Sequence, residues 1–345
     1  MKAVREIVVY AQNVNIGGAK ILLQTLVEGL LEAYPDTRVR VLLGNSGDLE
    51  VDHPRLIAEI LPGTWARIRA MWRREDNVFY FGNLPPMRRA TNSLLYVHNL
   101  YMTLPPGELL RDSSVGIGYK LKYAVLGMYL RCFAGRVETV ACQTRQMQER
   151  IERILPVSTL VAPFSRPVRK LDLPEEFDLC YVGIPSEHKN HGRFLEALSI
   201  LSAEGVPARV AVTIPDSPGN ADLLAEVGRL NREARLEISN AGFVSFEEAC
   251  SIYNRSRALC FPSLKESYGL PVVEAVSLGL ALLIADLPYA DVLVRGGERF
   301  DPESARSMAD AIKRFLEAPS EIPPAALRDA DSLEKIMEKV LGQAG

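Results

Sequence analysis

Residues 261–275 read FPSLKESYGLPVVEA: an apolar run, a polar loop and a second apolar run. The first run predicts a buried strand, and the second predicts a helix with Pro271 near its first turn, where proline is tolerated. Backbone amides at such a helix start bind anions, and Gly269 lets a phosphate approach the backbone. Glu266 precedes this anion site and Glu274 follows it, so both could accept hydrogen bonds from sugar or ribose hydroxyls. Alternatively, Glu266 caps the helix and Glu274 interacts with its dipole in the first turns. The spacing alone leaves both interpretations open.

Around this segment, strand-like and helix-like runs alternate through the second half of the chain. Short β-branched or aromatic runs predict strands, and runs with apolar residues every three or four positions predict helices. Such alternation predicts a parallel sheet covered on both faces. The predicted strands are 178–182, 209–214, 237–243, 258–262 and 280–285, and the predicted helices are 193–203, 222–232, 246–256 and 271–278.

The first half of the chain repeats the alternation. A strand at 7–10, a turn at Gly17 and Gly18, a helix at 19–31 and a strand at 38–43 form a βαβ unit, and further strands are predicted at 78–81, 94–98, 139–142 and 159–162. Because 345 residues exceed what one core usually covers, we expect two Rossmann-like α/β domains facing an interdomain cleft. Prolines near the middle of the chain mark the boundary between them. The expected organisation is a domain at 1–165, a linker at 166–176, a domain at 177–322 and a helical tail at 323–345.

Residues 261–275 resemble the Glu-x7-Glu signature of glycosyltransferase family 4, the glycosyl transferases group 1. The resemblance extends over the second half of the chain. It implies a GT-B fold and a retaining transferase that moves a hexose from a nucleoside diphosphate sugar. It also implies that Glu266 binds the donor sugar, that Glu274 binds the ribose, and that the domains at 1–165 and 177–322 bind the acceptor and the donor. The matching positions are Pro262, Ser263, Glu266, Tyr268, Gly269, Pro271, Glu274 and Ala275.

Residues 181–200, YVGIPSEHKNHGRFLEALSI, contain a second match to this family. The family pattern has an arginine directly after a glycine and a lysine six residues after that glycine. Lys189 stands at the right distance from Gly183, and a lysine there can offset the charge of a departing diphosphate. Ile184 stands where the arginine should be. The resemblance therefore implies a catalytic Lys189 and requires a second positive charge from elsewhere, for which Arg193, His188 and the first domain are candidates.

The first domain carries two further resemblances. Gly17 and Gly18 resemble the turn that faces the donor phosphates in the family, although two glycines before a helix are common. His98 ends a predicted strand, and a similarly placed histidine in the family contacts the donor sugar, so it is a candidate catalytic residue; a structural capping role is the alternative. The missing GxGxxG pattern argues against a dinucleotide-dependent dehydrogenase. The other residues expected to bind the donor or its nucleotide are Gly183, Val244, Ser267, Tyr268, Gly269 and Leu270.

No cofactor and no metal are expected. His188 and His191 flank Lys189 without a third ligand, so they are interpreted as loop histidines. The five cysteines, odd in number and without CxxC spacing, are interpreted as buried reduced thiols. No apolar run has the length of a spanning helix or a signal peptide, and a cytoplasmic location is therefore expected.

Charge is unevenly distributed, with 23 Lys/Arg against 15 Asp/Glu in residues 1–170 and 17 against 28 in residues 171–345. Residues 61–145 interleave basic residues with aromatic ones such as Trp65 and Trp72, and residues 117–133 mix lysines with apolar side chains. Such a surface could rest on an anionic membrane; the alternative is a buried helix with solvated basic residues. With the resemblance, it predicts peripheral binding at the inner face of the membrane, a glycan or lipid-linked acceptor in bacterial surface polysaccharide or lipopolysaccharide assembly, and no nucleic-acid partner.

Two other function classes share this architecture. A nonhydrolysing sugar-nucleotide epimerase would need several catalytic carboxylates and histidines, and the chain has four histidines in all. A nucleotide- or glycan-binding protein that kept the fold and lost turnover would explain Ile184.

Overall fold

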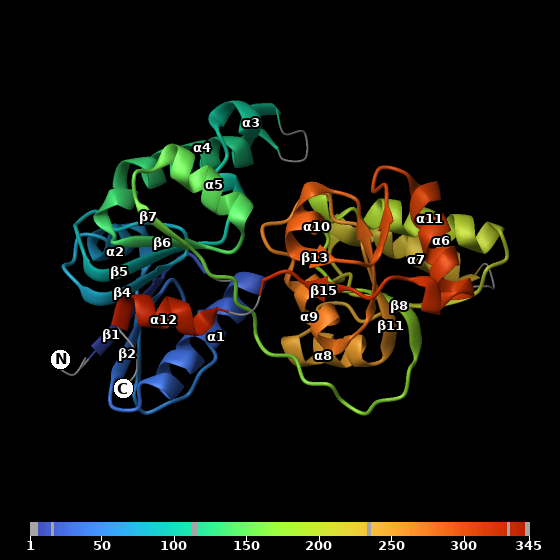
Figure 1. Ribbon diagram of the computed structural model, residues 1–345, viewed down its shortest axis with the longest axis horizontal. Coiled ribbons are helices and arrows are strands. Elements are labelled where there is room, and N and C mark those ends of the chain that lie inside the picture. The colour runs from blue at the N-terminus through green and yellow to red at the C-terminus, as the bar shows by residue number, and fades with distance from the viewer. Residues whose placement is uncertain (1–5, 15–16, 112–115, 233–235, 330–331, 342–345) are drawn as a thin grey trace. The chain divides into compact units, whose positions relative to one another are not determined.

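The computed structural model describes residues 6–14, 17–111, 116–232, 236–329 and 332–341. The chain forms two compact units (Figure 1), unit 1 with Met1–Arg166 and Ala330–Gly345 and unit 2 with Pro167–Asp329. Each unit contains a parallel sheet with helices packed on it. The predicted α/β architecture of two Rossmann-like parallel sheets is therefore confirmed.

Unit 1 is built on a seven-stranded parallel sheet with the order β3-β2-β1-β4-β5-β6-β7. Its inner strands are nearly continuous apolar runs because helices cover both faces. The edge strand β3 was not predicted, since its isoleucines are exposed and it shows no buried face. The strands are β1 (Glu6–Ala11), β2 (Arg38–Leu43), β3 (Leu56–Ile60), β4 (Asp76–Phe81), β5 (Thr91–Val97), β6 (Thr139–Cys142) and β7 (Ser158–Val161). The helices are α1 (Gly18–Ala33), α2 (Gly63–Ala70), α3 (Pro106–Arg111), α4 (Ile117–Phe133), α5 (Arg145–Ile154) and α12 (Leu333–Leu341).

Unit 2 is built on a six-stranded parallel sheet with the order β10-β9-β8-β11-β12-β14. Helices α6, α7 and α11 pack together, and α8 packs against α9 away from them (Figure 1). The strands are β8 (Phe177–Tyr181), β9 (Ala208–Val212), β10 (Leu236–Asn240), β11 (Ser256–Phe261), β12 (Ala281–Ala285) and β14 (Glu298–Phe300), with a small antiparallel pair of β13 (Val294–Arg295) and β15 (Ala326–Leu327). The helices are α6 (His191–Ala203), α7 (Ala221–Arg232), α8 (Phe246–Asn254), α9 (Leu270–Leu278), α10 (Pro288–Leu293) and α11 (Ala305–Glu317).

The last part of the chain divides between the two units, unlike the predicted helical tail at 323–345. Strand β15 pairs with β13 and keeps the chain in unit 2 up to Asp329. Helix α12 then packs on α1, β4 and β5 of unit 1. Gly29 of α1 permits this packing, because a Cβ there would lie 2.9 Å from Leu333 Cδ2. At the other boundary, the predicted linker at 166–176 falls almost entirely within unit 2.

Two further expectations concerned the burial of the cysteines and the presence of membrane-spanning helices. Four of the five free cysteines are buried, but Cys132 is exposed at the end of α4, so the interpretation of all five as buried thiols is wrong for that residue. Within the described ranges, no helix combines the length and the hydropathy needed to cross a bilayer.

Candidate functional site

The two predicted catalytic residues of unit 2 lie in direct contact. β8 and β11 are parallel neighbours, so the loops that follow them leave the same edge of the sheet. Lys189 ends a short 3-10 helix in the first loop, and Glu266 lies in the second. Lys189 Nζ is 2.6 Å from Glu266 Oε1, and the side chains are 17% and 11% exposed. The structure thus joins two segments that are 77 residues apart in sequence.

The neighbouring Asn190 fixes the Lys189 loop. Its backbone is left-handed, with φ 61°, a conformation that asparagine tolerates better than most residues. Its side-chain amide donates to the carbonyls of Pro262 (3.2 Å) and Pro302 (2.8 Å). The Tyr181 hydroxyl donates to the Lys189 carbonyl, and Lys189 Nζ lies 5.3 Å from the centroid of the Phe261 ring. The sequence prediction missed Asn190, although its place directly after Lys189 was a usable signal.

The Glu266 loop is anchored on its other side by Ser263. The buried Ser263 hydroxyl donates to the His188 carbonyl at 3.1 Å, and Leu264 N donates to the same carbonyl at 2.7 Å. The Tyr289 hydroxyl in turn donates to the Ser263 carbonyl at 2.7 Å. These bonds hold the two loops against each other, which places the lysine and the carboxylate with little freedom.

Helix α9 begins at Leu270, directly after Gly269, whose φ is 73°. No side chain caps this helix, so the alternative in which Glu266 caps it is wrong. Val272 N and Val273 N bond the Gly269 carbonyl, and Pro271 has no N–H. Within the described part of the chain, the N–H groups of Gly269 and Leu270 donate no backbone hydrogen bond. Of the amides at this helix start, these two therefore remain for the predicted anion site.

Glu274 is buried within unit 2. It is the fifth residue of α9, outside the first turn, and only 6% exposed, so the helix-dipole alternative is wrong. The Tyr253 hydroxyl of α8 donates to its Oε2 at 2.9 Å. Burial raises the pKa of the Glu274 carboxyl to about 7, although the hydrogen bond from Tyr253 lowers it. No motif pointed to Tyr253, which lies 21 residues away from Glu274.

Of the candidates for a second cation, His188 lies directly before Lys189 in the loop after β8, with its Nδ1 3.2 Å from Ser186 Oγ. Ile184 is 48% exposed, and Arg193 is paired with Glu196 at 2.6 Å. His191 is the first residue of α6 and buried, so its interpretation as a loop histidine is wrong. Its Nε2 contacts the Gly183 carbonyl at 3.2 Å, and burial lowers its pKa to about 4 despite that contact, so it is neutral at pH 7.

The other residues of unit 2 that were predicted to bind the donor or its nucleotide differ in burial. Gly183 N donates a hydrogen bond to Thr213 Oγ1 at 2.8 Å, so this amide already has a partner within the protein. The Tyr268 side chain belongs to the hydrophobic core. Val244 lies between β10 and α8 and packs partly on the same core. Ser267 and Leu270 are half-buried beside the Glu266 loop.

Unit 1 holds the other predicted residues. Gly17 has φ 66° and immediately precedes Gly18, the first residue of α1. His98 follows β5, and Asn83 fixes its ring: Asn83 Oδ1 accepts from His98 N (2.8 Å) and Asn99 N (2.9 Å), so its Nδ2 must donate to His98 Nε2 at 3.2 Å. The imidazole proton is therefore on Nδ1. Burial lowers the His98 pKa to about 4, which makes it a neutral group at pH 7.

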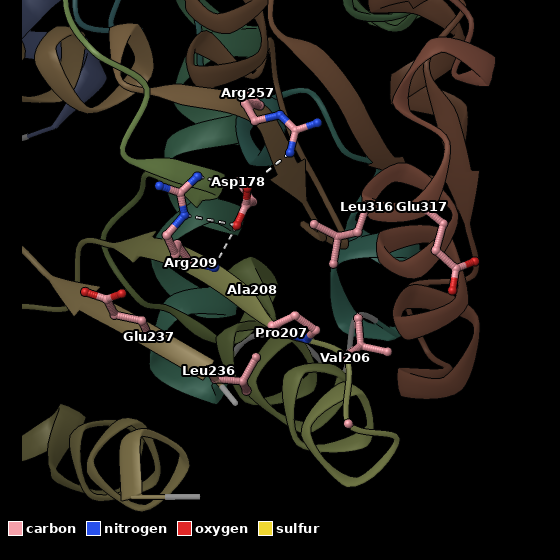
Figure 2. A pocket seen from close by; sticks show the side chains of 11 residues that line it. Asp178, Val206, Pro207, Ala208, Arg209, Leu236, Glu237, Arg257, Leu316 and Glu317 are labelled. Carbon is pink, nitrogen blue, oxygen red and sulfur yellow. Dashed lines mark hydrogen bonds and ion pairs between the residues drawn. The ribbon is translucent and has the colours of Figure 1, made fainter. Parts of the chain in front are cut away.

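A cavity of about 720 Å³ lies at the opposite edge of the unit 2 sheet, where β8, β9, β10 and β11 begin (Figure 2). Asp178 accepts hydrogen bonds there from Arg209 and Arg257, which links three strand starts. None of the predicted site residues lines this cavity. Among the described residues, no group of three or more His, Cys, Asp or Glu side chains is arranged to hold a metal ion.

Comparisons with known proteins bear on the family and on the fold. Residues 167–330, which include the whole of unit 2, match the family model "Glycosyl transferases group 1". The O-antigen chain mannosyltransferase RfbU of Salmonella typhimurium (strain LT2) is 32% identical over 80 residues, which are 23% of this chain and 23% of that protein. This chain thus spans under a quarter of the relative it matches.

Two solved structures show the same fold over nearly the whole chain. Sucrose-phosphate synthase from Thermosynechococcus elongatus has a TM-score of 0.68 at 14% identity and covers 99% of this chain and 95% of its own. HepE of Anabaena, solved in complex with UDP and glucose, has a TM-score of 0.60 at 14% identity and covers 99% of this chain and 93% of its own. Both the predicted GT-B fold class and the predicted resemblance to group 1 are confirmed.

Proposed function

We propose that this chain, with its GT-B fold and its group 1 match over residues 167–330, is a retaining glycosyltransferase that moves a hexose from a nucleoside diphosphate sugar to a glycan or lipid-linked acceptor. The observation that carries the proposal is the contact between Lys189 and Glu266 at 2.6 Å, at the carboxyl edge of the unit 2 sheet. A cation and a carboxylate at one point suit a ligand that is anionic at its phosphates and hydroxylated at its sugar.

The proposed roles follow from the chemistry of each group. Lys189 offsets charge on the departing diphosphate, together with the N–H groups of Gly269 and Leu270. Glu266 accepts from hydroxyls of the donor sugar, and Glu274 accepts from the ribose. His98, neutral and held by Asn83, contacts the donor sugar. Before the donor binds, Lys189 and Glu266 satisfy each other; the donor exchanges this ion pair for one contact with each partner.

In the proposed reaction, the bond between the anomeric carbon and the diphosphate oxygen breaks as the acceptor oxygen bonds to that carbon. Attack and departure occur on the same face, so the anomeric configuration is retained, and the acceptor proton passes to the departing phosphate oxygen. Ile184 removes one positive charge from the family pattern. Lys189 therefore carries more of the electrostatic stabilisation than in a site with both cations.

The sugar and the process are proposed from the relatives. RfbU is named an O-antigen chain mannosyltransferase, and HepE is solved with UDP and glucose. We therefore propose a mannosyl or another hexosyl donor, and assembly of a bacterial surface polysaccharide or lipopolysaccharide as the process. A protein that binds the donor without turnover is the second candidate, and Ile184 is the observation that favours it.

Thermal shift with UDP- and GDP-linked glucose and mannose is the first test of this proposal. We expect one base to stabilise the protein selectively, because binding to the folded state alone raises the apparent stability by about 2.7 kcal/mol at a hundredfold excess over Kd. NMR of the product formed from the selected donor should then show the anomeric configuration of the donor. An inverted product would contradict retention, stabilisation without any product would favour the inactive candidate, and epimerised donor would indicate an epimerase.

Peripheral binding of unit 1 to an anionic membrane is also proposed, and the structure changes which residues support it. Phe79, Tyr101 and Tyr123, counted in the basic and aromatic window 61–145, are buried in the core of unit 1. Arg67 donates to the carbonyls of Leu61 and Gly44, and Arg73 pairs with Glu59, so these two arginines are structural. The window as a whole is therefore not one continuous docking surface.

Helix α4 is the strongest remaining element for such docking. Apolar residues lie exposed along one face, and α4 contains Lys120, Lys122 and Arg131 but no acidic residue. Exposed apolar side chains at helical spacing, flanked by bases, suit the boundary between headgroups and acyl chains. Trp65 of α2 and Trp72, which follows that helix, are exposed as well. The apolar face of α4 consists of Ile117, Leu121, Val125 and Met128.

Sedimentation with vesicles tests this docking. Wild-type protein should bind anionic phosphatidylglycerol vesicles at low salt and lose binding as salt screens the charges. Changing Leu121, Val125 and Met128 together to Gln should weaken binding about a hundredfold, since each buries apolar area worth about 1 kcal/mol. Phe243→Gln, which changes an even more exposed apolar residue of unit 2, is the control. Equal binding by the triple variant and the wild type would contradict the assignment of α4.

A further inference from the structure

Tyr253 and Glu274 form a buried pair between α8 and α9. Tyr253 has no exposed surface, and its hydroxyl donates to Glu274 Oε2 at 2.9 Å. Among the described residues, this is the single hydrogen bond made by the Glu274 carboxylate, so Oε1 accepts none. The two oxygens of the carboxylate therefore have different surroundings: one is fixed by the protein, and the other is unused.

Among the described residues, no cation compensates the charge of this pair. The titratable groups that face it are Cys180 of β8 and Cys250 of α8. From the other elements packed on α9, the strands β11, β12 and β15, no charged side chain faces the carboxylate. A buried carboxylate without a cation is costly, and each hydrogen bond to its charged form matters more than it would at the surface. The Tyr253 hydroxyl is the group that provides that bond.

We propose that Tyr253 is a positioning residue for nucleotide binding: its hydroxyl holds Glu274 Oε2 and leaves Oε1 for the ribose hydroxyls of the donor. This inference rests on the proposed function, because it takes Glu274 as the ribose-binding residue. It adds a residue from α8 that no motif of the sequence indicated. It also makes nucleotide affinity depend on the protonation of Glu274.

The pH dependence has a definite direction. An ionised carboxylate accepts two hydrogen bonds from adjacent ribose hydroxyls better than a protonated one does. Burial raises the Glu274 pKa to about 7, and the Tyr253 hydroxyl opposes this rise. Nucleotide affinity should therefore fall as pH drops through about 7, and removal of the hydroxyl should move that midpoint to higher pH.

Calorimetric titration of UDP and of GDP between pH 6 and pH 9 tests the inference. Tyr253→Phe keeps the ring and removes the hydroxyl. We expect it to weaken binding of the accepted nucleotide about tenfold near pH 7 and less at pH 9, with the midpoint shifted to higher pH. Tyr10→Phe is the matched control, because Tyr10 of unit 1 also donates within a buried contact and lies near a glutamate, Glu75, at 3.4 Å.

Glu274→Gln separates the possible failures. The terminal phosphate of the nucleotide also titrates near pH 6, and the Gln variant reports that contribution alone. Wild-type affinity in Glu274→Gln, or no binding of either nucleotide to the wild-type protein, would contradict the proposed donor site itself. Weak binding in Glu274→Gln with an unchanged midpoint in Tyr253→Phe, or with a loss that is equal at every pH, would overturn only the role of Tyr253.

Discussion

Replacement of Lys189 by alanine is expected to lower kcat by about 10²–10³-fold, because one contact to charge that develops in the transition state contributes about 2.7–4 kcal/mol. Ile184 strengthens this expectation, since the arginine of the family pattern is missing at that position and the candidate replacement Arg193 is paired with Glu196. KM for the donor should change less than kcat, because the charge on the leaving oxygen develops only as the bond breaks.

The controls for Lys189 use a second variant and a matched ion pair. Alanine at 189 leaves the largely buried Glu266 without its cation, which can itself destabilise unit 2. Lys189→Gln keeps a hydrogen-bond donor for Glu266 without the charge, so it should fold and still be slow. Lys313→Ala breaks a similar lysine–glutamate pair, with Glu204, on the surface of the same unit, and should leave kcat unchanged. Wild-type kcat in the folded Gln variant would remove Lys189 from the mechanism.

Glu274→Gln is expected to weaken nucleotide binding about 10- to 100-fold and to make the free protein more stable at pH 8. The binding loss reflects hydrogen bonds to a charged acceptor, which contribute about 1.5–3 kcal/mol. For stability, the folded pKa is raised from 4.5 to about 7, so the stabilising contribution of this group is complete below pH 4.5 and is lost as pH rises through 7. Glutamine stays neutral throughout, so it should recover up to about 3 kcal/mol at pH 8.

Urea denaturation at pH 5 and pH 8 measures the stability effect. The gain from Glu274→Gln should be clear at pH 8 and small at pH 5. Glu248→Gln is a control of opposite sign: Glu248 accepts from Ser245 N in the cap of α8, which lowers its pKa, so its loss should destabilise the protein at pH 8. A Glu274→Gln protein that is less stable than wild type at pH 8 would contradict the cost assigned to the buried charge.

The sequence predicted the fold well where local pattern and burial agree. The apolar runs at β1, β8 and β11 read as strands because helices cover both faces of each sheet. Strand β3 was missed because an edge strand can expose its isoleucines and still form its hydrogen bonds on one side. The packing of α12 on unit 1 was not predicted, because the local sequence pattern of an amphipathic helix does not indicate which of two units it packs against.

Only those residues of the candidate site that belong to a sequence motif could be predicted. The family signature identified Lys189 and Glu266, and the structure brings them together, but their roles remain predictions. Asn190 and Tyr253 act through tertiary contacts 72 and 21 residues away, and no spacing rule reports such contacts. The burial of Glu274 was also not predicted. A glutamate is usually expected on the exposed face of a helix, and only the packing of α8 on α9 shows that this position is covered.

The path of the chain through α12 sets an order of events during synthesis. All strands of unit 1 are synthesised before unit 2 begins, but α12 follows only after Asp329. Until then, the apolar surface of α1, β4 and β5 that receives Ile336, Met337 and Val340 stays uncovered. A nascent chain therefore carries an incomplete first unit while the second unit folds, and this exposed surface is where chaperones or premature association would act.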